Sequence, residues 1–364
     1  MTALAGLRIG LVGPLPPPAG GMAMQTRQLA ELLRGEQADV LLVPTNAPYR
    51  PAWVARWRGL RAVFRLVPYL LALWRAAGRS DVMHVMANSG WSWHLFAAPA
   101  VWVARLRRVP VVVNYRGGEA AEFLQRSARS VRRTLHCATR LIVPSGFLKD
   151  VFARHGMAAD VVPNVVDLAR FHPAAQLSPA PNLIVARNLE AIYDNGTALR
   201  ALALVCRECA GARLLVCGTG PEEGALRRLA DQLGIATQVD FAGRLDRDEM
   251  ARRLRDSRVA LNPSLADNMP NSVLEALASG VPVVSTHVGG VPHVVRDGET
   301  ALLVPPSNPA AMAEAILRLL RDPATAERLR GAGLDSVRAY TWTAVGPRWG
   351  AVYRALATPR ASHA

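Results

Sequence analysis

Two carboxylates flank a predicted helix start in the segment Ser264–Ser285. Asp267 lies in the loop before this helix, and Glu275 lies one turn inside it. Pro and Asn are common where helices begin, and the sequence predicts Asn271 as the N-cap. A glycine and a proline then end the helix, and Val281–Ser285 predicts a buried strand. The segment therefore predicts a loop and a short helix, each with one carboxylate, followed by a strand.

The start of this helix is a candidate phosphate site. The first backbone N–H groups of a helix have no partner within it, and the helix dipole adds partial positive charge there. Glu275 is close enough to this end to bind a hydroxyl, and we expect Asp267 across the pocket. A phosphate beside a diol indicates a nucleotide, and the second carboxylate indicates a further group attached to it. The candidate ligand-binding residues here are Asp267, Met269, Pro270, Asn271, Ser272, Val273 and Glu275.

Predicted strands and helices alternate along the chain, which is typical of parallel sheets with helices on both faces. A chain of 364 residues is long enough for two domains. We expect an α/β protein with Rossmann-like domains in residues 1–170 and 182–344, and a C-terminal helix in 345–364 that crosses back to the first domain. The predicted strands are Leu7–Val12, Val40–Val43, Val82–Val85, Val111–Asn114, Leu141–Val143, Asp160–Pro163, Leu183–Ala186, Arg213–Cys217, Gln238–Ala242, Val259–Asn262, Val281–Ser285 and Ala301–Val304.

The segment with the two carboxylates resembles the donor site of a known enzyme family. Asp267 and Glu275, followed by Ser279-Gly280 and Val281-Pro282-Val283-Val284, are similar to the signature of the retaining family 4 glycosyltransferases. The resemblance extends over nearly the whole chain. It implies the glycosyltransferase-B (GT-B) architecture, in which two Rossmann-like domains face each other across a cleft. It also implies that Glu275 holds the ribose of a nucleotide sugar and that Asp267 faces the sugar.

The resemblance implies further donor contacts. Gly20-Gly21 precedes an amphipathic helix and matches the family's first glycine loop, where backbone approaches the ligand. Arg187 follows a strand and matches the Arg that compensates the charge of the leaving diphosphate, so Arg187 and Asp267 are the candidate catalytic residues. The family's Lys is missing: Asn195 occupies its position, and the only Lys of the chain, Lys149, belongs to the first domain. Asp267 is also one methylene shorter than the commoner Glu.

A glycine-containing turn of the first domain is the second candidate region. Family members often have a His after the strand that precedes it, whereas this chain reads Asn114-Tyr115-Arg116-Gly117-Gly118-Glu119. Arg116 is expected to contact phosphate, and Tyr115 or Asn114 to replace the usual hydrogen bond to the donor sugar. A purely structural turn is the alternative. Glu119 or Glu122 as a base would indicate inversion. The resemblance instead implies retention, with the leaving phosphate taking the acceptor proton.

The composition indicates which binding partners and which cellular location to expect. The formal net charge is +15, carried almost entirely by Arg. Such charge favours anionic partners, and without a nucleic-acid-binding motif a membrane surface is expected rather than nucleic acid. No apolar run is long enough to span a bilayer, and the first residues do not resemble a signal peptide. We expect a cytoplasmic protein, on the inner face of the plasma membrane, with no metal and no cofactor besides the nucleotide-diphosphate sugar.

The stretch Tyr49–Arg79 is basic and amphipathic. Its large apolar residues recur at steps of four and three, which predicts one helical stripe formed by Trp53, Trp57, Leu60, Phe64, Val67, Leu71 and Trp74. Pro68 is expected to break or kink this helix. Such a helix fits an anionic bilayer surface. A helix buried against the first sheet needs the same stripe, so that interpretation stays open.

These expectations favour a retaining glycosyltransferase that moves a sugar from a nucleotide-diphosphate sugar to a glycan or lipid-linked acceptor in envelope or exopolysaccharide synthesis. Two alternatives remain. A nucleotide-sugar epimerase on the same fold would need more carboxylates and His in the cleft. A non-catalytic protein that binds nucleotide sugar or acts as a scaffold is favoured by the missing Lys. The sequence identifies neither the nucleotide, the sugar nor the acceptor.

Overall fold

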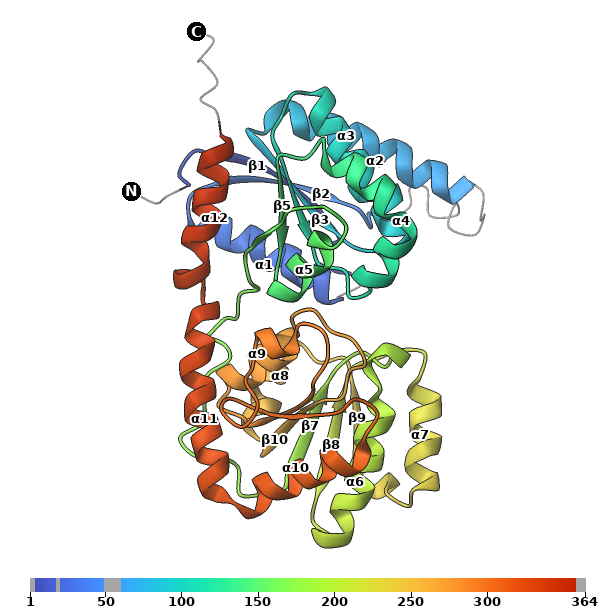
Figure 1. Cartoon of the computed structure of the whole chain (residues 1–364), viewed down its shortest axis with the longest axis vertical. Coiled ribbons are helices and arrows are strands. Elements are labelled where there is room, and N and C mark those ends of the chain that lie inside the picture. Colours follow the sequence, from blue (N-terminus) through green and yellow to red (C-terminus); the bar gives the residue numbers. More distant parts are fainter. Residues whose placement is uncertain (1–3, 18–19, 49–59, 358–364) are drawn as a thin grey trace. The chain divides into compact units, whose positions relative to one another are not determined.

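The computed structural model describes residues 4–17, 20–48 and 60–357 and divides into two compact units (Figure 1). Unit 1 comprises Met1–Pro163 and Gly346–Ala364, and unit 2 comprises Asn164–Val345. Each unit contains a six-stranded sheet in which all strand pairs are parallel. The predicted alternation of strands and helices is therefore confirmed for both halves of the chain.

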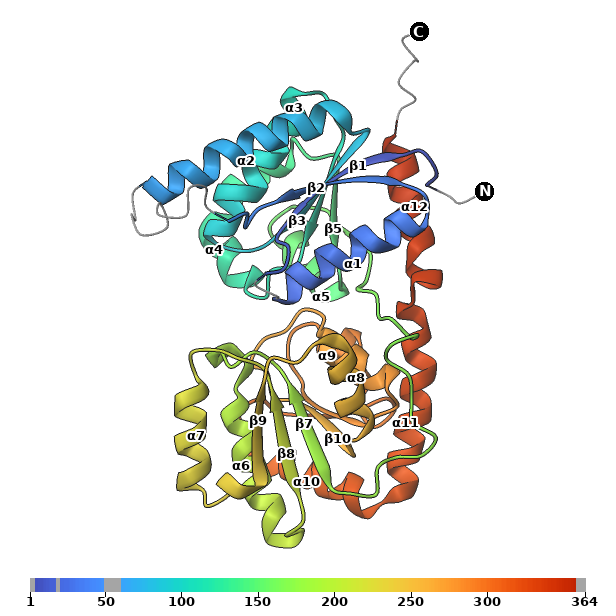
Figure 2. The same cartoon turned by 180° about the vertical axis from the view of Figure 1, so that it is seen from behind.

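In unit 1 the strands have the order β2-β1-β3-β4-β5-β6. Strands β3 and β4 are buried along their whole length, because helices cover both faces of the sheet. Helix α1 packs along β1 and β2 (Figure 2). The elements are β1 Arg8–Gly13, α1 Gly21–Gly35, β2 Asp39–Pro44, α2 Leu60–Arg79, β3 Val82–Ala87, the π-helical turn η2 Trp93–Ala97, α3 Ala98–Leu106, β4 Val111–Tyr115, α4 Ala120–Leu135, β5 Arg140–Val143, α5 Gly146–Ala153 and β6 Asp160–Val161.

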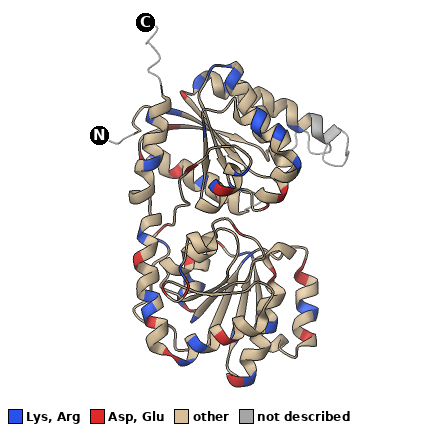
Figure 3. Ribbon diagram, in the orientation of Figure 1, with Lys and Arg blue, Asp and Glu red and all other residues tan. Residues whose placement is uncertain are grey.

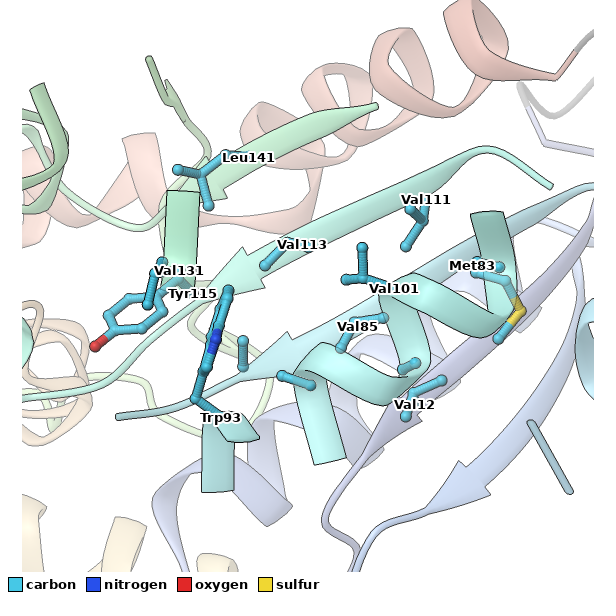
Figure 4. Close-up of a cluster of buried hydrophobic side chains, with 14 of the residues drawn as sticks. Val12, Met83, Val85, Trp93, Val101, Val111, Val113, Tyr115, Val131 and Leu141 are labelled. Carbon is cyan, nitrogen blue, oxygen red and sulfur yellow. The ribbon is translucent and has the colours of Figure 1, made fainter. Parts of the chain in front are cut away.

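The core of unit 1 joins one sheet face to helices α2 to α5. In β3, Met83 and Val85 point into this cluster, where Trp93 is also buried (Figure 4). Alternate residues of a strand point to opposite faces, so His84 faces the other way. It meets Tyr353 there, on α12 (Trp342–Leu356). Helix α12 thus packs against His84 on the face of the sheet opposite this cluster.

In unit 2 the strands have the order β12-β11-β10-β7-β8-β9. Two buried clusters lie on opposite faces of the sheet. One includes side chains of α6, α7 and α10, and the other includes side chains of α8 and α9. The elements are β7 Asn182–Ala186, α6 Asn195–Glu208, β8 Arg213–Cys217, α7 Glu223–Gln232, β9 Val239–Gly243, α8 Arg247–Arg255, β10 Val259–Asn262, α9 Asn271–Ala278, β11 Val283–Thr286, β12 Leu302–Val304, α10 Pro309–Arg321 and α11 Pro323–Val337.

Each sheet has one point at which the strand order reverses. In unit 1 this point lies between β1 and β3, and in unit 2 between β7 and β10. Ligands of open α/β sheets bind outside the carboxyl ends of the strands at such switch points. The loops that follow these four strands are therefore where a ligand site is expected.

The strands lie where the sequence places them, within two residues at each end. Three details differ. The N-cap of α9 is Pro270, so Asn271 is the first helical residue and not the cap. Helix α12 begins at Trp342, earlier than Val345. Helix α2 runs through Pro68, so of the two expected effects, a break or a kink, the break does not occur. The part of the predicted stripe before Leu60 lies outside the described residues.

Candidate active site

The switch point of unit 2 brings a buried Arg and a carboxylate together. Arg187 follows β7, and Asp267 lies in the loop after β10. The two side chains form an ion pair, and each is about nine-tenths buried, at 11% and 12% exposure. Arg187 also donates from Nη2 and Nε to Ser264 Oγ, at 2.9 and 3.2 Å. Both candidate catalytic residues thus lie at one point on the carboxyl edge of the sheet.

Arg187 is held on a further side by an aromatic ring. Its guanidinium lies 4.5 Å from the ring centroid of Tyr193, in a 3-10 turn of the loop before α6. Burial lowers the pKa of Arg187 to about 10, and the nearby Tyr193 and Glu275 oppose this. The side chain therefore remains a cation at neutral pH, fixed by three neighbours before any ligand enters.

Glycines make close backbone contacts beside both Arg187 and Asp267. A Cβ on Gly289 would lie 2.2 Å from Asp267 O, and one on Gly290 would lie 1.8 Å from Asn268 O. A Cβ on Gly218 would likewise lie 2.0 Å from Arg187 O. Only glycine permits these approaches. Gly218, Gly289 and Gly290 therefore position the loops that carry Arg187 and Asp267.

The start of α9 presents backbone groups more than side chains. Met269 and Val273 are buried, as is Pro270, so these residues can offer a ligand only main-chain atoms. The first N–H groups of the helix lack partners within it. Ser272 lies in this turn, and its Oγ has no hydrogen-bond partner among the described residues. The geometry is that of an anion site at a helix N-terminus with a hydroxyl beside it.

Asn164 fixes this helix start from the first residue of unit 2. Its Nδ2 donates to Met269 O at 3.1 Å and to Asn271 Oδ1 at 2.7 Å. The side chain of Asn271 is therefore engaged within the protein, and its backbone remains the part that can face a phosphate.

Glu275 lies one turn into α9 and is half-buried. Burial raises the pKa of Glu275 to about 7, while the charges of Arg247 and Arg187 act in the opposite direction. Arg247, the first residue of α8, was not predicted from the sequence. The available signal was an Arg directly after Asp246, because Asp is a common N-cap residue. Glu275 is thus a carboxylate whose ionisation responds to pH near neutrality.

Asn195 supports a loop instead of projecting a charge. It begins α6, is 4% exposed, and donates from Nδ2 to Asn188 O at 3.0 Å. Arg200 lies about one turn further along α6. Both residues line a cavity of about 420 Å³ beside the start of that helix. Asn195 thus places no positive charge beside Asp267, and Arg187 is the cation that pairs with this carboxylate.

In unit 1, Gly20 is the N-cap of α1 and Gly21 its first residue. A Cβ on either would meet no atom within 4 Å. The packing of the described residues does not require glycine at either position. Open backbone at the carboxyl end of β1 is what close approach of a ligand needs.

Two of the four residues expected to contact sugar or acceptor in unit 1 are inaccessible. Asn114 and Tyr115 are fully buried, and Tyr115 OH bonds to Ser89 Oγ at 2.7 Å. The side chains of Asn114 and Tyr115 thus present no exposed surface, and their contact with a sugar stays a prediction. Arg116 is half-buried and donates from Nη1 to Gln25 Oε1 at 2.8 Å. Glu119 is exposed at the N-cap of α4.

Within the described ranges, no group of three or more His, Cys, Asp or Glu side chains is arranged to hold a metal ion. The sequence contains one Asp-x-Asp triplet, Asp246-Arg247-Asp248, a pattern that can bind a metal ion. Asp246 caps α8 by accepting from the N–H groups of Asp248 and Glu249, and Asp248 pairs with Arg170 at 2.7 Å. This triplet therefore begins a helix.

The exposed face of α2 was also open to two interpretations. The described residues of its predicted stripe are exposed: Phe64 38%, Val67 50%, Leu71 52% and Trp74 46%. The face buried in the core carries Tyr69, Leu73, Ala76 and Ala77 instead. The stripe therefore does not pack on the sheet. No described helix combines the length and hydrophobicity that a membrane crossing requires.

The fold and the site define a GT-B glycosyltransferase. Residues 19–170 match the family model "Glycosyltransferase Family 4", and residues 181–322 match "Glycosyl transferases group 1". The chain belongs to this family, whose enzymes use nucleotide-sugar donors. The resemblance seen in the sequence is therefore confirmed at the level of the family.

The relatives include mannosyltransferases of inositol lipids and a glycogen synthase of Mycobacterium tuberculosis, which is 29% identical over 295 residues. The chain is 28% identical over 376 residues to the phosphatidyl-myo-inositol mannosyltransferase of Mycobacterium leprae, covering 97% of this chain and 98% of that one. It is 27% identical over 382 residues to a GDP-mannose-dependent phosphatidylinositol monomannoside mannosyltransferase of Mycobacterium tuberculosis, covering 94% of each. Among solved structures, Anabaena HepE in complex with UDP has a TM-score of 0.76 at 14% identity, covering 96% of this chain and all of that one. This last likeness concerns the fold.

Proposed function

We propose that this glycosyltransferase moves a sugar from a nucleoside-diphosphate sugar to a lipid-linked or glycan acceptor, with retention of anomeric configuration and without a metal ion. The observation that carries the proposal is the convergence of Arg187, the start of α9 and Glu275 around the switch point of unit 2. A cation, a helix N-terminus and a carboxylate match the diphosphate and ribose of one ligand.

In the proposed reaction, the diphosphate lies against the first turn of α9 and replaces Asp267 as the partner of Arg187. The bond from the anomeric carbon to the phosphate oxygen breaks while the acceptor oxygen attacks on the same face. The leaving phosphate oxygen takes the acceptor proton. Arg187 and the helix dipole stabilise the negative charge that develops on the diphosphate.

Metal independence follows from the same argument. A metal ion in such a transfer would neutralise the leaving diphosphate. Here a fixed guanidinium and the α9 N-terminus provide positive charge in a partly buried site, where charge interactions are stronger than in water. One cation in place of the family's two predicts a reduced rate of transfer, so the non-catalytic alternative becomes a measurable outcome.

The acceptor side is proposed to work at an anionic membrane on the cytoplasmic face. The exposed stripe of α2 continues onto the neighbouring α3, where Trp102 is 38% and Leu106 71% exposed. Arg107 lies over the Trp74 ring, at 4.6 Å from its centroid. An apolar surface with Trp and Arg at its border is suited to lie in the interface of an anionic bilayer.

The charge of this region supports the same conclusion. Between Asp39 and Glu119 the only carboxylate in the sequence is Asp81, whereas Arg residues recur throughout. Figure 3 shows basic residues on the described part of this region. Anionic lipid attracts such a segment, at about 1 kcal/mol per basic residue near the surface. The named mannosyltransferases act on phosphatidylinositol lipids, which carry this negative charge. A role in envelope or exopolysaccharide synthesis is proposed on these grounds.

The test is turnover of nucleotide sugars monitored by proton NMR, in buffer with EDTA. The proposal predicts release or transfer of a sugar whose first-formed anomer matches the donor. An inverted anomer or full dependence on added divalent metal would contradict the mechanism. Tight nucleotide binding without any turnover, whatever acceptor lipid is supplied, would favour the non-catalytic alternative.

The membrane surface needs its own test. Leu71→Glu is expected to reduce co-sedimentation with phosphatidylglycerol vesicles at least tenfold, because it places a charge within the apolar surface. Leu265→Glu is the matched control, since Leu265 is 43% exposed but belongs to unit 2. Equal vesicle binding by both variants and the wild type would rule out the α2 surface.

A further inference from the structure

A chain of buried polar side chains crosses unit 1 and ends at Arg116. Tyr353 OH lies 2.7 Å from His84 Nδ1, and His84 Nε2 lies 3.1 Å from Asn114 Nδ2. Asn114 Oδ1 in turn accepts from Arg116 Nε at 3.2 Å. The links join α12, β3 and β4, which are far apart in the sequence. We call these four residues the Arg116 chain.

The donors and acceptors along the Arg116 chain can be assigned in only one way. A guanidinium only donates, so the Asn114 atom that faces it must be the amide oxygen. The amide nitrogen of Asn114 then donates to His84 Nε2, which must be unprotonated. His84 therefore carries its proton on Nδ1 and donates it to Tyr353 OH. Each member fixes the orientation of the next, and the chain requires a neutral imidazole.

Packing leaves the chain little freedom. His84, Asn114 and Tyr353 are each 0% exposed. The His84 ring lies 4.9 Å from that of Trp349, which stacks on Tyr353 at 5.7 Å. Buried polar groups cost free energy unless they are hydrogen-bonded, and a satisfied network favours a single arrangement. The chain therefore holds Arg116 in one position.

That position is the switch point of unit 1. Arg116 follows β4, and its Nη1 bonds to Gln25 on α1, the helix that follows β1. Strand β3 lies between β1 and β4 in the sheet. A side chain that joins β4 to α1 must therefore pass the carboxyl end of β3, where the strand order reverses. This is the edge where a ligand of unit 1 is expected.

We propose that Arg116 binds a phosphate group of a substrate, and that Tyr353, His84 and Asn114 are positioning residues that hold its guanidinium for this purpose. The inference rests on the proposed function and assigns a charge requirement to the substrate that unit 1 binds. Two of the groups that Arg116 contacts, the amide oxygens of Asn114 and Gln25, are neutral, and they orient the guanidinium. The phosphate comes from the diphosphate of the donor or from a phosphate-bearing acceptor.

A double-mutant cycle tests the positioning. Arg116→Ala is expected to weaken the affected substrate about tenfold to a hundredfold, the effect of losing hydrogen bonds to a charged group. Tyr353→Phe removes one hydroxyl and is expected to raise the same KM about threefold to tenfold, with kcat nearly unchanged. In the Arg116→Ala background, Tyr353→Phe should add nothing. An equal effect of Tyr353→Phe in both backgrounds would overturn the proposal.

The matched control is Tyr69→Phe. Tyr69 is a buried tyrosine of the same unit, and its hydroxyl donates to Phe96 O at 2.7 Å, outside the Arg116 chain. Tyr69→Phe and Tyr353→Phe are expected to lower the melting temperature comparably, while only the second changes KM. The same KM change in both variants would mean that the Arg116 chain only stabilises the fold. That result would overturn the proposal.

Calorimetric titration with UDP and GDP separates the two phosphate sources. Weaker nucleotide binding by Arg116→Ala indicates the donor diphosphate. Unchanged nucleotide binding with a raised KM for a phosphatidylinositol acceptor indicates the acceptor phosphate. No change in either overturns the inference. If Arg187→Ala then still weakens nucleotide binding, the proposed function survives; if the wild type binds no nucleotide, the proposed function falls as well.

The direction of the chain has a readout that needs no ligand. Imidazole nitrogen shifts of histidine-labelled protein, with His84→Gln for assignment, are expected to show His84 neutral at pH 7, with the proton on Nδ1. A proton on Nε2, or a charged ring, would mean that Asn114 cannot donate to His84. The argument that orients Arg116 would then be wrong.

Discussion

The two sheets place a buried or half-buried Arg at their switch points, but they hold it with opposite chemistry. In unit 2 the partner of Arg187 is a carboxylate, Asp267, with Ser264 beside it. In unit 1 two partners of Arg116 are neutral amides, and an imidazole and a phenol support one of them. An ion pair must be exchanged when a phosphate arrives, whereas the amide oxygens of Asn114 and Gln25 carry no charge for a phosphate to displace.

The largest effect expected from this difference is on catalysis. Arg187→Ala should lower kcat about 10²- to 10³-fold, since it removes the cation aimed at the leaving diphosphate. Arg116→Ala should act mainly on KM, because Arg116 is expected to bind a phosphate group without meeting the developing charge. Steady-state kinetics of both variants measure the split. A larger loss of kcat in Arg116→Ala would reverse the roles assigned to the two units.

A backbone change sharpens the account of unit 2. Gly290→Ala should destabilise the protein by about 1–3 kcal/mol, because the new Cβ meets the backbone of Asn268. It should also move the Asp267 loop and weaken nucleotide binding. Gly331→Ala in α11 is the control: a Cβ there meets nothing within 4 Å, so a gain of about 0.5–1 kcal/mol is expected. Denaturant unfolding measures the stability of both variants. Equal stabilities would contradict the claim that the backbone contact with Asn268 requires glycine at position 290.

The neutral support of unit 1 predicts a dependence of stability on pH. Burial, with the charge of Arg116 nearby, lowers the pKa of His84 to about 3. The unfolded chain takes up this proton below a pH of about 6.5, whereas the folded chain does not. The free energy of unfolding should therefore fall as the pH drops from about 6.5 towards 3. The contribution of His84 between pH 7.5 and 5.0 is about 2 kcal/mol.

Denaturant unfolding of the wild type and of His84→Gln at these two pH values measures that contribution. The other titrating groups are common to both proteins, so their effects cancel in the comparison. The variant should lose less stability on acidification. An identical loss would show that His84 protonates in the folded protein, which the Arg116 chain does not allow.

Glu275 should give the smallest of the predicted effects. Its pKa is raised to about 7 by burial, and ribose hydroxyls donate to the ionised form. The affinity for a nucleoside diphosphate should therefore increase by up to about tenfold from pH 6 to pH 8. The ligand's own phosphate titrates in the same range, so Glu275→Gln is the reference in calorimetry. Parallel pH profiles would remove Glu275 from the ribose site.

The sequence predicted most of the fold because the strands are apolar runs between glycine and proline turns. It predicted the meeting of Arg187, Asp267 and α9 because these residues end or follow neighbouring strands. It did not predict that Asn114 and Tyr115 are buried. Both belong to β4. Because helices cover both faces of the sheet, the side chains on either face of this strand are buried. The contact of His84 with Tyr353 spans most of the chain, and no local pattern reports it.

The stripe on α2 shows the same limit. Apolar periodicity identified a helix with an apolar face, but Tyr69, Leu73 and Ala76 form a second apolar face on the same helix. Which face meets the sheet depends on where the chain enters and leaves the helix. Periodicity carries no information on that choice.

Calorimetric titration of UDP and GDP into wild type, Arg187→Ala and Asp267→Asn tests the central claim most directly. The claim is that a donor diphosphate takes the place of Asp267 on Arg187. The account predicts that at least one nucleotide binds the wild type, that Arg187→Ala weakens this binding at least tenfold, and that Asp267→Asn strengthens it. Binding to Arg187→Ala as tight as to the wild type would contradict the claim.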